Sequence, residues 1–535
     1  MGLAERTTLI PSSDEAALRS VSRDPGLPST EQLLLQGGDA RIALTDGTSN
    51  KYGCAPQPDR GILAFGSSTA STISEAGFEA ANALRRRLLV AAKIEAPENV
   101  HAREIRRIRQ TLEELCGVAD PPGSEIIFAA SGTDLHLIAS QLVAGSDTSD
   151  TLVIMVDGEE TGRGVPMAVA GRHFNARTAL GESVAEGKPV SGNARIKVAT
   201  VPVRLADGTP REANDIDAEV ESLATAAVED HRKVFLVLAD VTKTGMIAPS
   251  ISCAMASRRR LADDVEIMVD ACQFRIAGTT LRSYLEHGFM VAVTGSKFLS
   301  GPTFAGALFL PSDCAKRLRN RRLPSGMSAY SSRAEWPAGW NAARSLPDTE
   351  NFGLLLRWEA ALAEFQAFRA IPEAEIKWFL QEFASAVQAR IGNDPFFSAL
   401  QVPVIDRSPL NNAESWDRLP TVFPFILHHA GAAGRKPFSR EKTAEIYRLL
   451  QIDLSGRPDP GLGSFDDRIA RLRCQLGQPV ACGERDGIQL SALRLCASAR
   501  LVVEATAQNR KNAQAVIEQA LRALDKVALL AAATG

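Results

Sequence analysis

The sequence lacks the features that would direct a protein to a membrane or out of the cell. Among its 535 residues, no apolar stretch approaches the roughly 18 residues that a membrane-spanning helix needs. The opening residues, MGLAERT, contain no apolar core of a signal peptide. Arg6 occupies the position at which N-myristoylation needs Ser or Thr. We therefore expect a cytoplasmic protein with no membrane partner.

Cysteine is sparse and scattered. The chain has 8 cysteines, and no two of them form a Cys-x-x-Cys pair. This spacing supports neither a disulfide framework nor a zinc site, and it is typical of a protein from a reducing compartment. We expect no bound metal.

A surplus of charge of either sign is also missing. The 60 Lys and Arg residues almost balance the 63 Asp and Glu residues, so the formal net charge is −3. No overall basic field therefore favours nucleic acid as a partner. The hydrophobic fraction of 45% and the charged fraction of 23% are ordinary for a soluble globular enzyme and exclude a largely disordered chain.

Short apolar runs alternate with helix-length segments over the first two thirds of the chain. The runs that we interpret as strands are 125–130, 151–157, 196–203, 233–241, 265–272, 289–296 and 306–311. Continuously apolar strands separated by amphipathic segments indicate a parallel sheet that is covered on both faces. The sequence thus predicts an α/β protein with a mainly parallel seven-stranded sheet flanked by helices. Ligands of such sheets bind at the carboxyl ends of the strands.

A chain of this length is too long for a single hydrophobic core. We expect an irregular N-terminal arm over 1–60, a large α/β domain over 61–345 and a smaller α+β domain over 346–535. Helical patterns cover 75–116, 352–370 and 510–531, and further apolar runs lie at 421–427 and 488–496.

Three segments at predicted strand ends carry residues suited to chemistry. Ser131, Gly132 and Thr133 follow the first strand and start a helix, where free N–H groups suit a phosphate and Thr133 can serve as the cap. Asp270 ends an apolar strand, which is costly unless a cation such as a protonated pyridine nitrogen meets it. Lys297 follows another strand among small residues and could form a Schiff base. Each segment alone also fits an ordinary cap, an ion pair or a solvent-facing lysine.

Together the three segments resemble the fold-type-I pyridoxal-phosphate enzymes, specifically the class V aminotransferase group that includes cysteine desulfurases and kynureninase. Ser131 to Asp134 is similar to that group's phosphate turn, Ser-Gly-(Ala)-Thr-Glu, with one residue fewer and Asp for Glu. Asp270-Ala271-Cys272-Gln273 matches its Asp-Ala-x-Gln, and Thr294-Gly295-Ser296-Lys297 matches its Ser-Gly-His-Lys. The resemblance runs from about residue 60 to 505.

The resemblance implies pyridoxal 5′-phosphate as the cofactor and a role for each matching residue. Lys297 would carry the cofactor and move protons, and Asp270 would keep the pyridine nitrogen protonated. These two are the implied catalytic residues. The implied cofactor-binding residues are Gly132, Thr133, Thr161, Asp270, Gln273, Thr294, Ser296, Lys297 and Thr349.

Further matches concern the substrate and a second subunit. Arg494, in Ala-Leu-Arg-Leu-Cys, resembles the arginine that holds the substrate carboxylate, and Ser67 and Ser68 lie in a small-residue loop that borders the substrate in relatives. The segment from Arg344 to Thr349 resembles one that sends a hydroxyl into the neighbouring subunit's phosphate site, so we expect a homodimer. Gly301-Pro302-x-x-x-Gly306 and Lys243-Thr244-Gly245 also match.

Two parts of the sequence depart from the group. Members of the group usually stack an aromatic or His ring on the cofactor from the segment that corresponds to residues 158–162. No such ring is present there in this sequence, so Thr161 is the candidate cover. Residues 172–215 are expected to form a surface insertion. His136 is expected to be a partly buried helix residue, the alternative being that it faces the pocket.

The reaction is expected at Cα of a small amino-acid substrate, and an aminotransferase-type transfer is favoured. The alternatives are a cysteine desulfurase or β-lyase, a kynureninase-like cleavage, and a catalytically inactive binding or regulatory protein. Cys482, on an expected exposed loop flanked by Gly and Pro, is the candidate persulfide nucleophile of a desulfurase.

Overall fold

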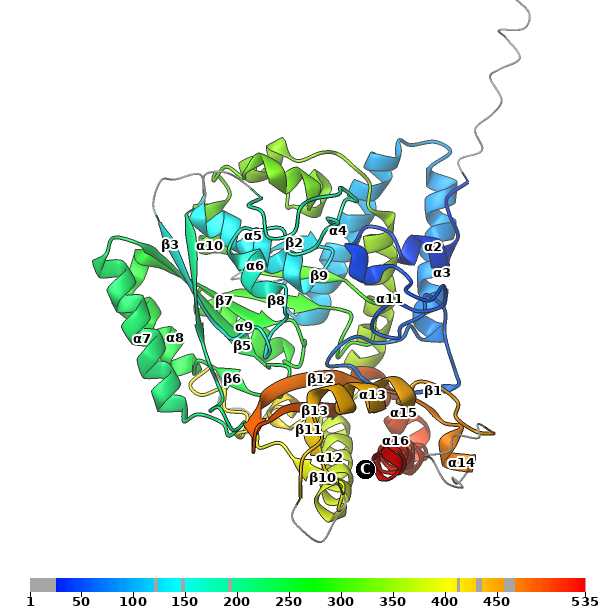
Figure 1. The fold of residues 1–535 in the computed structure, drawn as a ribbon. Helices are drawn as coiled ribbons and strands as arrows, with labels where there is room; N and C mark the ends of the chain where they lie inside the picture. The colour runs from blue at the N-terminus through cyan, green and yellow to red at the C-terminus, as the bar shows by residue number, and fades with distance from the viewer. Residues whose placement is uncertain are drawn as a thin grey trace, which may run out of the picture.

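Two β-sheets organise the described part of the chain in the computed structural model (Figure 1). The described residues are 26–119, 124–145, 150–190, 195–410, 414–429, 435–456 and 467–534. No helix within them is both long and apolar enough to cross a bilayer.

Within these residues the larger sheet has eight strands, in the order β2-β9-β8-β7-β5-β3-β4, with β6 paired to β5. The strands are β2 (Ser124–Ala129), β3 (Thr151–Val156), β4 (Ile196–Val201), β5 (Lys233–Asp240), β6 (Ile247–Ala248), β7 (Val265–Ala271), β8 (Met290–Thr294) and β9 (Gly306–Pro311). All seven predicted strands are present. The pairs among β4, β3, β5, β7 and β8 are parallel, whereas β9 runs antiparallel to both β2 and β8. The predicted α/β class is therefore confirmed.

Both faces of this sheet are buried, which explains why its strands are continuously apolar. Along β2, Ile126 and Phe128 belong to the hydrophobic core on one face, and Ile127 and Ala129 to the core on the other. Successive side chains of a strand point to opposite faces, so every position must be apolar when both faces are covered.

Helices cover the two faces of the larger sheet (Figure 1). On one side lie α5 (Gly132–Ala144), α6 (Val165–Val169) and α10 (Ser312–Leu318). On the other side lie α3 (Glu75–Ala91), α4 (Pro97–Cys116), α7 (Ala213–Glu229), α8 (Ile251–Leu261), α9 (Gly278–Glu286) and α11 (Phe352–Arg369). The predicted helical stretch 75–116 is broken before Pro97, which occupies the first turn of α4 as its fixed φ angle allows.

The second sheet has five strands in the described residues, in the order β1-β12-β13-β11-β10. They are β1 (Ile62–Phe65), β12 (Arg473–Arg485), β13 (Ile488–Cys496), β11 (Val422–Leu427) and β10 (Phe397–Ala399). Helices α12 (Glu373–Asn393), α13 (Arg440–Leu450), α14 (Asp467–Ala470), α15 (Ala499–Arg510) and α16 (Ala513–Thr534) pack around it (Figure 1). Strand β1 pairs in parallel with β12, so a segment that we assigned to the large domain completes the sheet of the small one. The domain boundaries otherwise stay a prediction.

The expected surface insertion, residues 172–215, and the expected irregular arm, residues 1–60, both contain regular structure in their described parts. Residues 172–215 do not form only a surface insertion, because β4 is the edge strand of the larger sheet and Val201 and Val203 are fully buried. The arm contains α2 (Thr30–Leu34) and a short 3₁₀ helix, Ala40–Ile42, in its described part.

Candidate functional site

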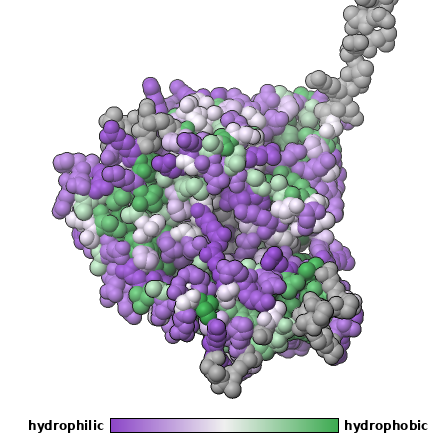
Figure 2. Space-filling model, viewed as in Figure 1, coloured by the Kyte–Doolittle hydropathy of each residue, from purple (hydrophilic) through white to green (hydrophobic). Residues whose placement is uncertain are grey.

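A cavity of about 800 Å³ lies where β5, β7 and β8 end and α5 begins. Strands β12 and β13, helix α13 and the N-terminal arm supply further parts of its wall. Hydrophilic side chains predominate around the middle of the face shown in Figure 2. All three sequence segments, around Gly132, Asp270 and Lys297, reach this one cavity, as expected for residues at the carboxyl ends of parallel strands.

The turn from β2 into α5 lines the cavity, and the first N–H groups of a helix have no partner within the helix itself. Ser131 caps the helix, because its Oγ accepts a hydrogen bond from the amide of Asp134 at 3.3 Å. The prediction that Thr133 is the cap is therefore wrong, and Thr133 lines the cavity from inside the first turn. A Cβ atom on Gly132 would lie 2.8 Å from Sγ of Cys272, so only glycine fits at this close approach.

The N-terminal arm adds a cation to this turn. Arg41 donates hydrogen bonds to Oγ1 of Thr133 and Oγ of Ser131, both at 3.2 Å, and Asp39 orients its guanidinium by an ion pair of 2.5 Å. The guanidinium also lies 4.6 Å from the centre of the Phe304 ring. Sequence reasoning missed Arg41, because nothing local to an irregular arm indicates which strand end it reaches.

Asp270 forms an ion pair with a histidine that we expected to be only a helix residue. Nε2 of His136 lies 3.2 Å from Oδ2 of Asp270, and Nδ1 lies 2.7 Å from the carbonyl oxygen of Gly132. A carboxylate and a carbonyl oxygen beside the two ring nitrogens favour a proton on each of them. His136 is fully buried and lines the cavity, so the alternative that it faces the pocket holds.

The pKa values of this pair agree with a charged state. Burial lowers the pKa of His136, but the charge of Asp270 and the hydrogen bonds to Asp270 and Gly132 raise it above its ordinary value overall. Burial raises the pKa of Asp270, yet His136, the amide of Cys272 and Lys297 bring it well below the usual range. Asp270 is thus a carboxylate at neutral pH.

Lys297 presents a partly buried side chain to the same cavity. Burial lowers its pKa, Cys272 and Asp270 oppose this, and the positive charges of Arg494 and Arg275 lower it further. Its carbonyl oxygen accepts hydrogen bonds from Oγ of Ser71 and from the amide of Ser300, which fix the turn after β8. An amine with a lowered pKa can act as a nucleophile and as a base.

Other predicted cofactor residues also line the cavity, and some of their polar groups form hydrogen bonds with the main chain. Thr294 donates its only hydroxyl proton to the carbonyl of Cys272 at 2.6 Å. Gln273 donates to the carbonyl of Ser68 at 3.0 Å, whereas Oγ of Ser68 is buried without a partner in the described residues. Ser296 and Thr161 also line the wall.

Arg494 lies fully buried at the wall formed by β13. It donates to the carbonyls of Lys243 and Gln478 at 3.2 and 2.6 Å and to Oγ1 of Thr69 at 2.9 Å. Its Nε is buried and has no partner within the described part of the chain. Gly477 makes room for it, since a Cβ there would come within 3.0 Å of that Nε.

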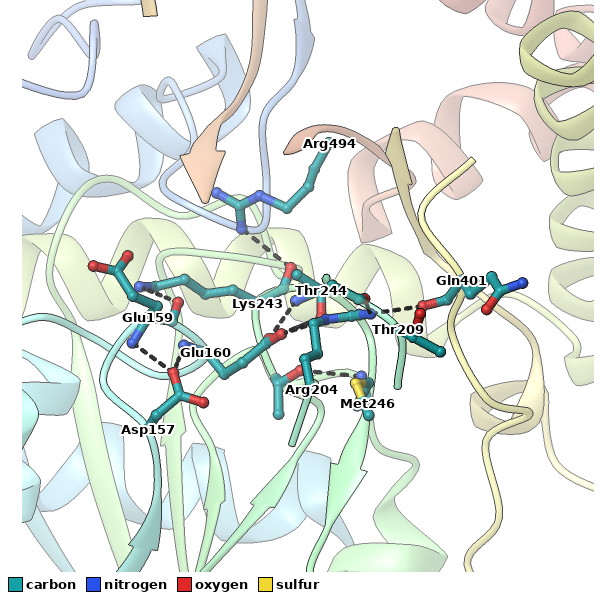
Figure 3. A network of polar contacts seen from close by, with 12 residues as sticks. Asp157, Glu159, Glu160, Arg204, Thr209, Lys243, Thr244, Met246, Gln401 and Arg494 are labelled. Carbon is teal, nitrogen blue, oxygen red and sulfur yellow. Dashed lines mark hydrogen bonds and ion pairs between the residues drawn. The ribbon is translucent and has the colours of Figure 1, made fainter. Parts of the chain in front are cut away.

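A second lysine, Lys243, reaches the cavity from the turn after β5 (Figure 3). Its Nζ donates to the carbonyls of Glu159 at 2.8 Å and Gly158 at 3.4 Å. Burial, together with the charges of Arg494 and Lys297, lowers its pKa to about 7. The sequence contained the signal for this residue, since Lys243 follows a predicted strand just as Lys297 does.

Beside Lys243, a buried ion pair links the loop after β3 to the segment after β4 (Figure 3). Arg204 approaches Oε1 of Glu160 to 3.1 Å, and Thr244 donates to the same carboxylate at 2.7 Å. Arg204 also donates to the carbonyl of Gln401 at 2.9 Å. Arg204 comes from the segment expected to be a surface insertion.

Three predicted residues lie outside the cavity lining. Ser67 donates to the carbonyl of Ala497 at 3.1 Å and faces a different cavity. Thr349 is exposed on a loop, and its expected role in a second subunit stays a prediction. Cys482 is 3% exposed on β12, and burial raises its pKa to about 11, so the exposed loop that we expected is wrong.

His136, Asp270 and Cys272 bring potential metal donors within 4.8 Å of one another. This arrangement favours a proton on each ring nitrogen of His136. Burial raises the pKa of the Cys272 thiol well above its ordinary value. Metal ligands must be deprotonated, so the cluster suits an organic cation better than a metal ion.

Several solved structures are similar to this chain at low sequence identity. A cystine C-S lyase, C-DES, in complex with its reaction product cysteine persulfide, is 15% identical with a TM-score of 0.48, over 86% of this chain and 98% of that chain. The cysteine desulfurase CsdA from Escherichia coli is 15% identical with a TM-score of 0.47, over 87% and 94%. A variant of SPT with PLP is 13% identical with a TM-score of 0.49, over 93% and 96%. No protein-family model and no curated protein matches the sequence.

Proposed function

We propose that the protein is a pyridoxal-phosphate-dependent enzyme that acts at Cα of an amino-acid substrate. One observation carries the proposal: a partly buried lysine, a carboxylate paired with a histidine, and a helix N-terminus next to an arginine all line one cavity. Each of these groups is suited to a different part of the cofactor.

The residues present fit this cofactor part by part. The start of α5 with Arg41 offers N–H donors and positive charge to a phosphate. Asp270 offers a full negative charge to a protonated pyridine nitrogen, and Lys297 offers a nucleophilic amine to an aldehyde. The cavity volume of about 800 Å³ is within the range of small-molecule sites, which is roughly 300–1,000 Å³. Thr161, which lines the cavity, stays the candidate to cover the cofactor ring.

The protein groups divide the work of the reaction among them. When bound, the cofactor supplies an electron sink for the bond broken at Cα. Asp270 keeps a proton on the pyridine nitrogen, and His136 orients that carboxylate and keeps it ionised. Lys297 takes and returns protons at carbon, which a lysine with a lowered pKa can do near neutral pH. Arg494, which lines the cavity, binds the α-carboxylate.

Among the possible reactions we favour an aminotransferase-type transfer. Persulfide chemistry needs an accessible thiolate, and all eight cysteines are buried in the described part of the chain. Cys482 has a raised pKa, and so has Cys272, the cysteine that lines the cavity. A desulfurase that uses Cys482 is therefore the weaker alternative. Elimination or kynureninase-like cleavage needs no thiol and stays the runner-up.

The proposal is tested by adding pyridoxal phosphate to the purified protein and recording the visible spectrum during a screen of amino acids. The proposal is supported if the bound cofactor absorbs in the visible range and this absorbance changes when an amino acid is added. The proposal is overturned if the protein shows neither the absorbance nor the change. Product identification then separates the branches, because transamination yields a keto acid, desulfuration yields sulfide and kynureninase-like cleavage yields alanine.

A further inference from the structure

The cavity contains a positive charge that the proposed cofactor and a substrate α-carboxylate do not use. Lys243 forms no ion pair within 4 Å among the described residues, and its amine meets only the main-chain carbonyls of Gly158 and Glu159. Arg494, which donates to the carbonyl of Lys243 itself, likewise meets only neutral acceptors in the described residues. Arg494, which is buried, and Lys243, which is partly buried, thus both line the cavity, and neither forms an ion pair among the described residues.

The nearest buried carboxylate is committed elsewhere. Glu160 accepts hydrogen bonds from the amide and hydroxyl of Thr244 and pairs with Arg204. The carbonyl of Glu160 accepts the amide of Lys243 at 2.8 Å, so the same cluster fixes the backbone from which the lysine extends. Arg204 neutralises Glu160, and the charge of Lys243 is left for a ligand.

The other carboxylate near Lys243 lies at the rim of the cavity. The side chain of Glu159 is 38% exposed and lies 3.7 Å from Arg163, which is itself exposed. It opposes the lowering of the Lys243 pKa but does not offset burial and the charges of Arg494 and Lys297. An anion bound beside Lys243 would favour the charged form of the lysine and so raise its pKa again.

From this arrangement we propose that the substrate is an acidic amino acid, with its α-carboxylate on Arg494 and a second anionic group on Lys243. The inference rests on the proposed function and adds the substrate class to it. The second group is a carboxylate or a chemically similar anion such as a sulfinate or a phosphate. Lys243 is then a specificity-determining residue, because an anionic side chain favours its charged form and pairs with it, whereas a neutral side chain does neither.

The test compares amino acids that differ in one charge and hardly in shape. The protein loaded with pyridoxal phosphate is titrated with L-aspartate against L-asparagine and with L-glutamate against L-glutamine, and dissociation constants are read from the visible spectrum. We expect the acidic member of at least one pair to bind about tenfold or more tightly. O-phospho-L-serine against L-serine shows whether the second anion is a phosphate.

Variants assign the preference to Lys243. In Lys243→Met the ratio is expected to fall to about one, with the affinity for the neutral member changed by no more than about threefold. Lys243→Arg keeps the charge and is expected to keep the preference. Lys442→Met, at a half-exposed lysine of α13 that pairs with Glu445 and does not line the cavity, is the matched control and is expected to behave as the wild type. If Lys243→Met does not fold, Lys243→Gln takes its place in the comparison.

Two results would overturn the inference while leaving the proposed function intact. One is that the spectrum of the wild-type protein responds to amino acids, but the neutral member of each pair binds as tightly as the acidic member or more tightly. The other is an acidic preference that survives in Lys243→Met and Lys243→Gln. A protein that shows no cofactor absorbance would instead overturn the proposed function, and the substrate inference with it.

Discussion

Changing Asp270 to asparagine removes the negative charge that faces Nε2 of His136 and keeps the size of the side chain. The two groups are 3.2 Å apart and buried, so little solvent screens them. A hydrogen bond between charged groups is worth about 1.5–3 kcal/mol, and one pKa unit corresponds to about 1.4 kcal/mol. We therefore expect the pKa of His136 to fall in Asp270→Asn, because the charge that favours the protonated ring is removed.

The assay is a pH titration of ¹⁵N-labelled histidine side chains by nuclear magnetic resonance, in protein without added cofactor. The chain has seven histidines, and the resonance that disappears in His136→Gln identifies the one of interest. The wild-type ring is expected to stay doubly protonated above pH 6.5, its ordinary pKa, because the pKa is raised in the folded state. An unchanged His136 pKa in Asp270→Asn would refute the reasoning.

The same pair predicts how stability depends on pH. The raised pKa of His136 gives a contribution that is complete below its ordinary pKa of 6.5 and is lost as the pH rises through the raised value. The lowered pKa of Asp270 gives one that is complete above its ordinary pKa of 3.8 and is lost as the pH falls through the lowered value. The ion pair should thus stabilise the fold most between pH 3.8 and pH 6.5, the ordinary pKa values of Asp270 and His136.

Three further changes test other parts of the site. Gly132→Ala would place a Cβ 2.8 Å from Sγ of Cys272. Overpacking of this kind usually costs about 1–3 kcal/mol. We therefore expect cofactor affinity, measured by absorbance titration, to fall about tenfold or more. Gly392→Ala, where no atom lies within 4 Å of the added Cβ, is the control, and equal affinities in the two variants would contradict the fit. Cys482→Ser should keep turnover within a few-fold, and a loss of about 100-fold, or about 2.7 kcal/mol, with substrate binding intact would instead favour a desulfurase. Thr349→Ala should weaken cofactor retention in a dimer, and a monomeric, fully active protein in sedimentation would exclude the shared site.

The strands and the three motifs were predictable because their signals are local. A strand buried on both faces is continuously apolar, and the residue that follows such a strand lies at the ligand-binding edge of the sheet. This rule found Asp270 and Lys297 from the sequence. Applied to β5, the same rule indicates Lys243, so that residue was within reach of sequence reasoning.

The rest of the site depends on contacts between distant segments. Arg41 reaches α5 across about 90 residues of chain, and nothing in its neighbourhood in the sequence indicates this. His136 was ambiguous, because a helix periodicity does not show which residue meets a particular strand end. Cys482 was misplaced because its Gly and Pro neighbours indicated a loop, whereas β12 accommodates them through two shifts of register against β13.

Borohydride reduction of the protein loaded with pyridoxal phosphate, followed by peptide mapping, tests the central claim most directly. Reduction makes the link between the cofactor and a lysine permanent, and mass spectrometry identifies that lysine. Two lysines with lowered pKa values, Lys297 and Lys243, line the cavity, so the experiment has a real competitor. We predict that the adduct lies on Lys297 and is lost in Lys297→Ala, which should remain folded. An adduct on Lys243 in the wild type, or none on either lysine, would contradict the account.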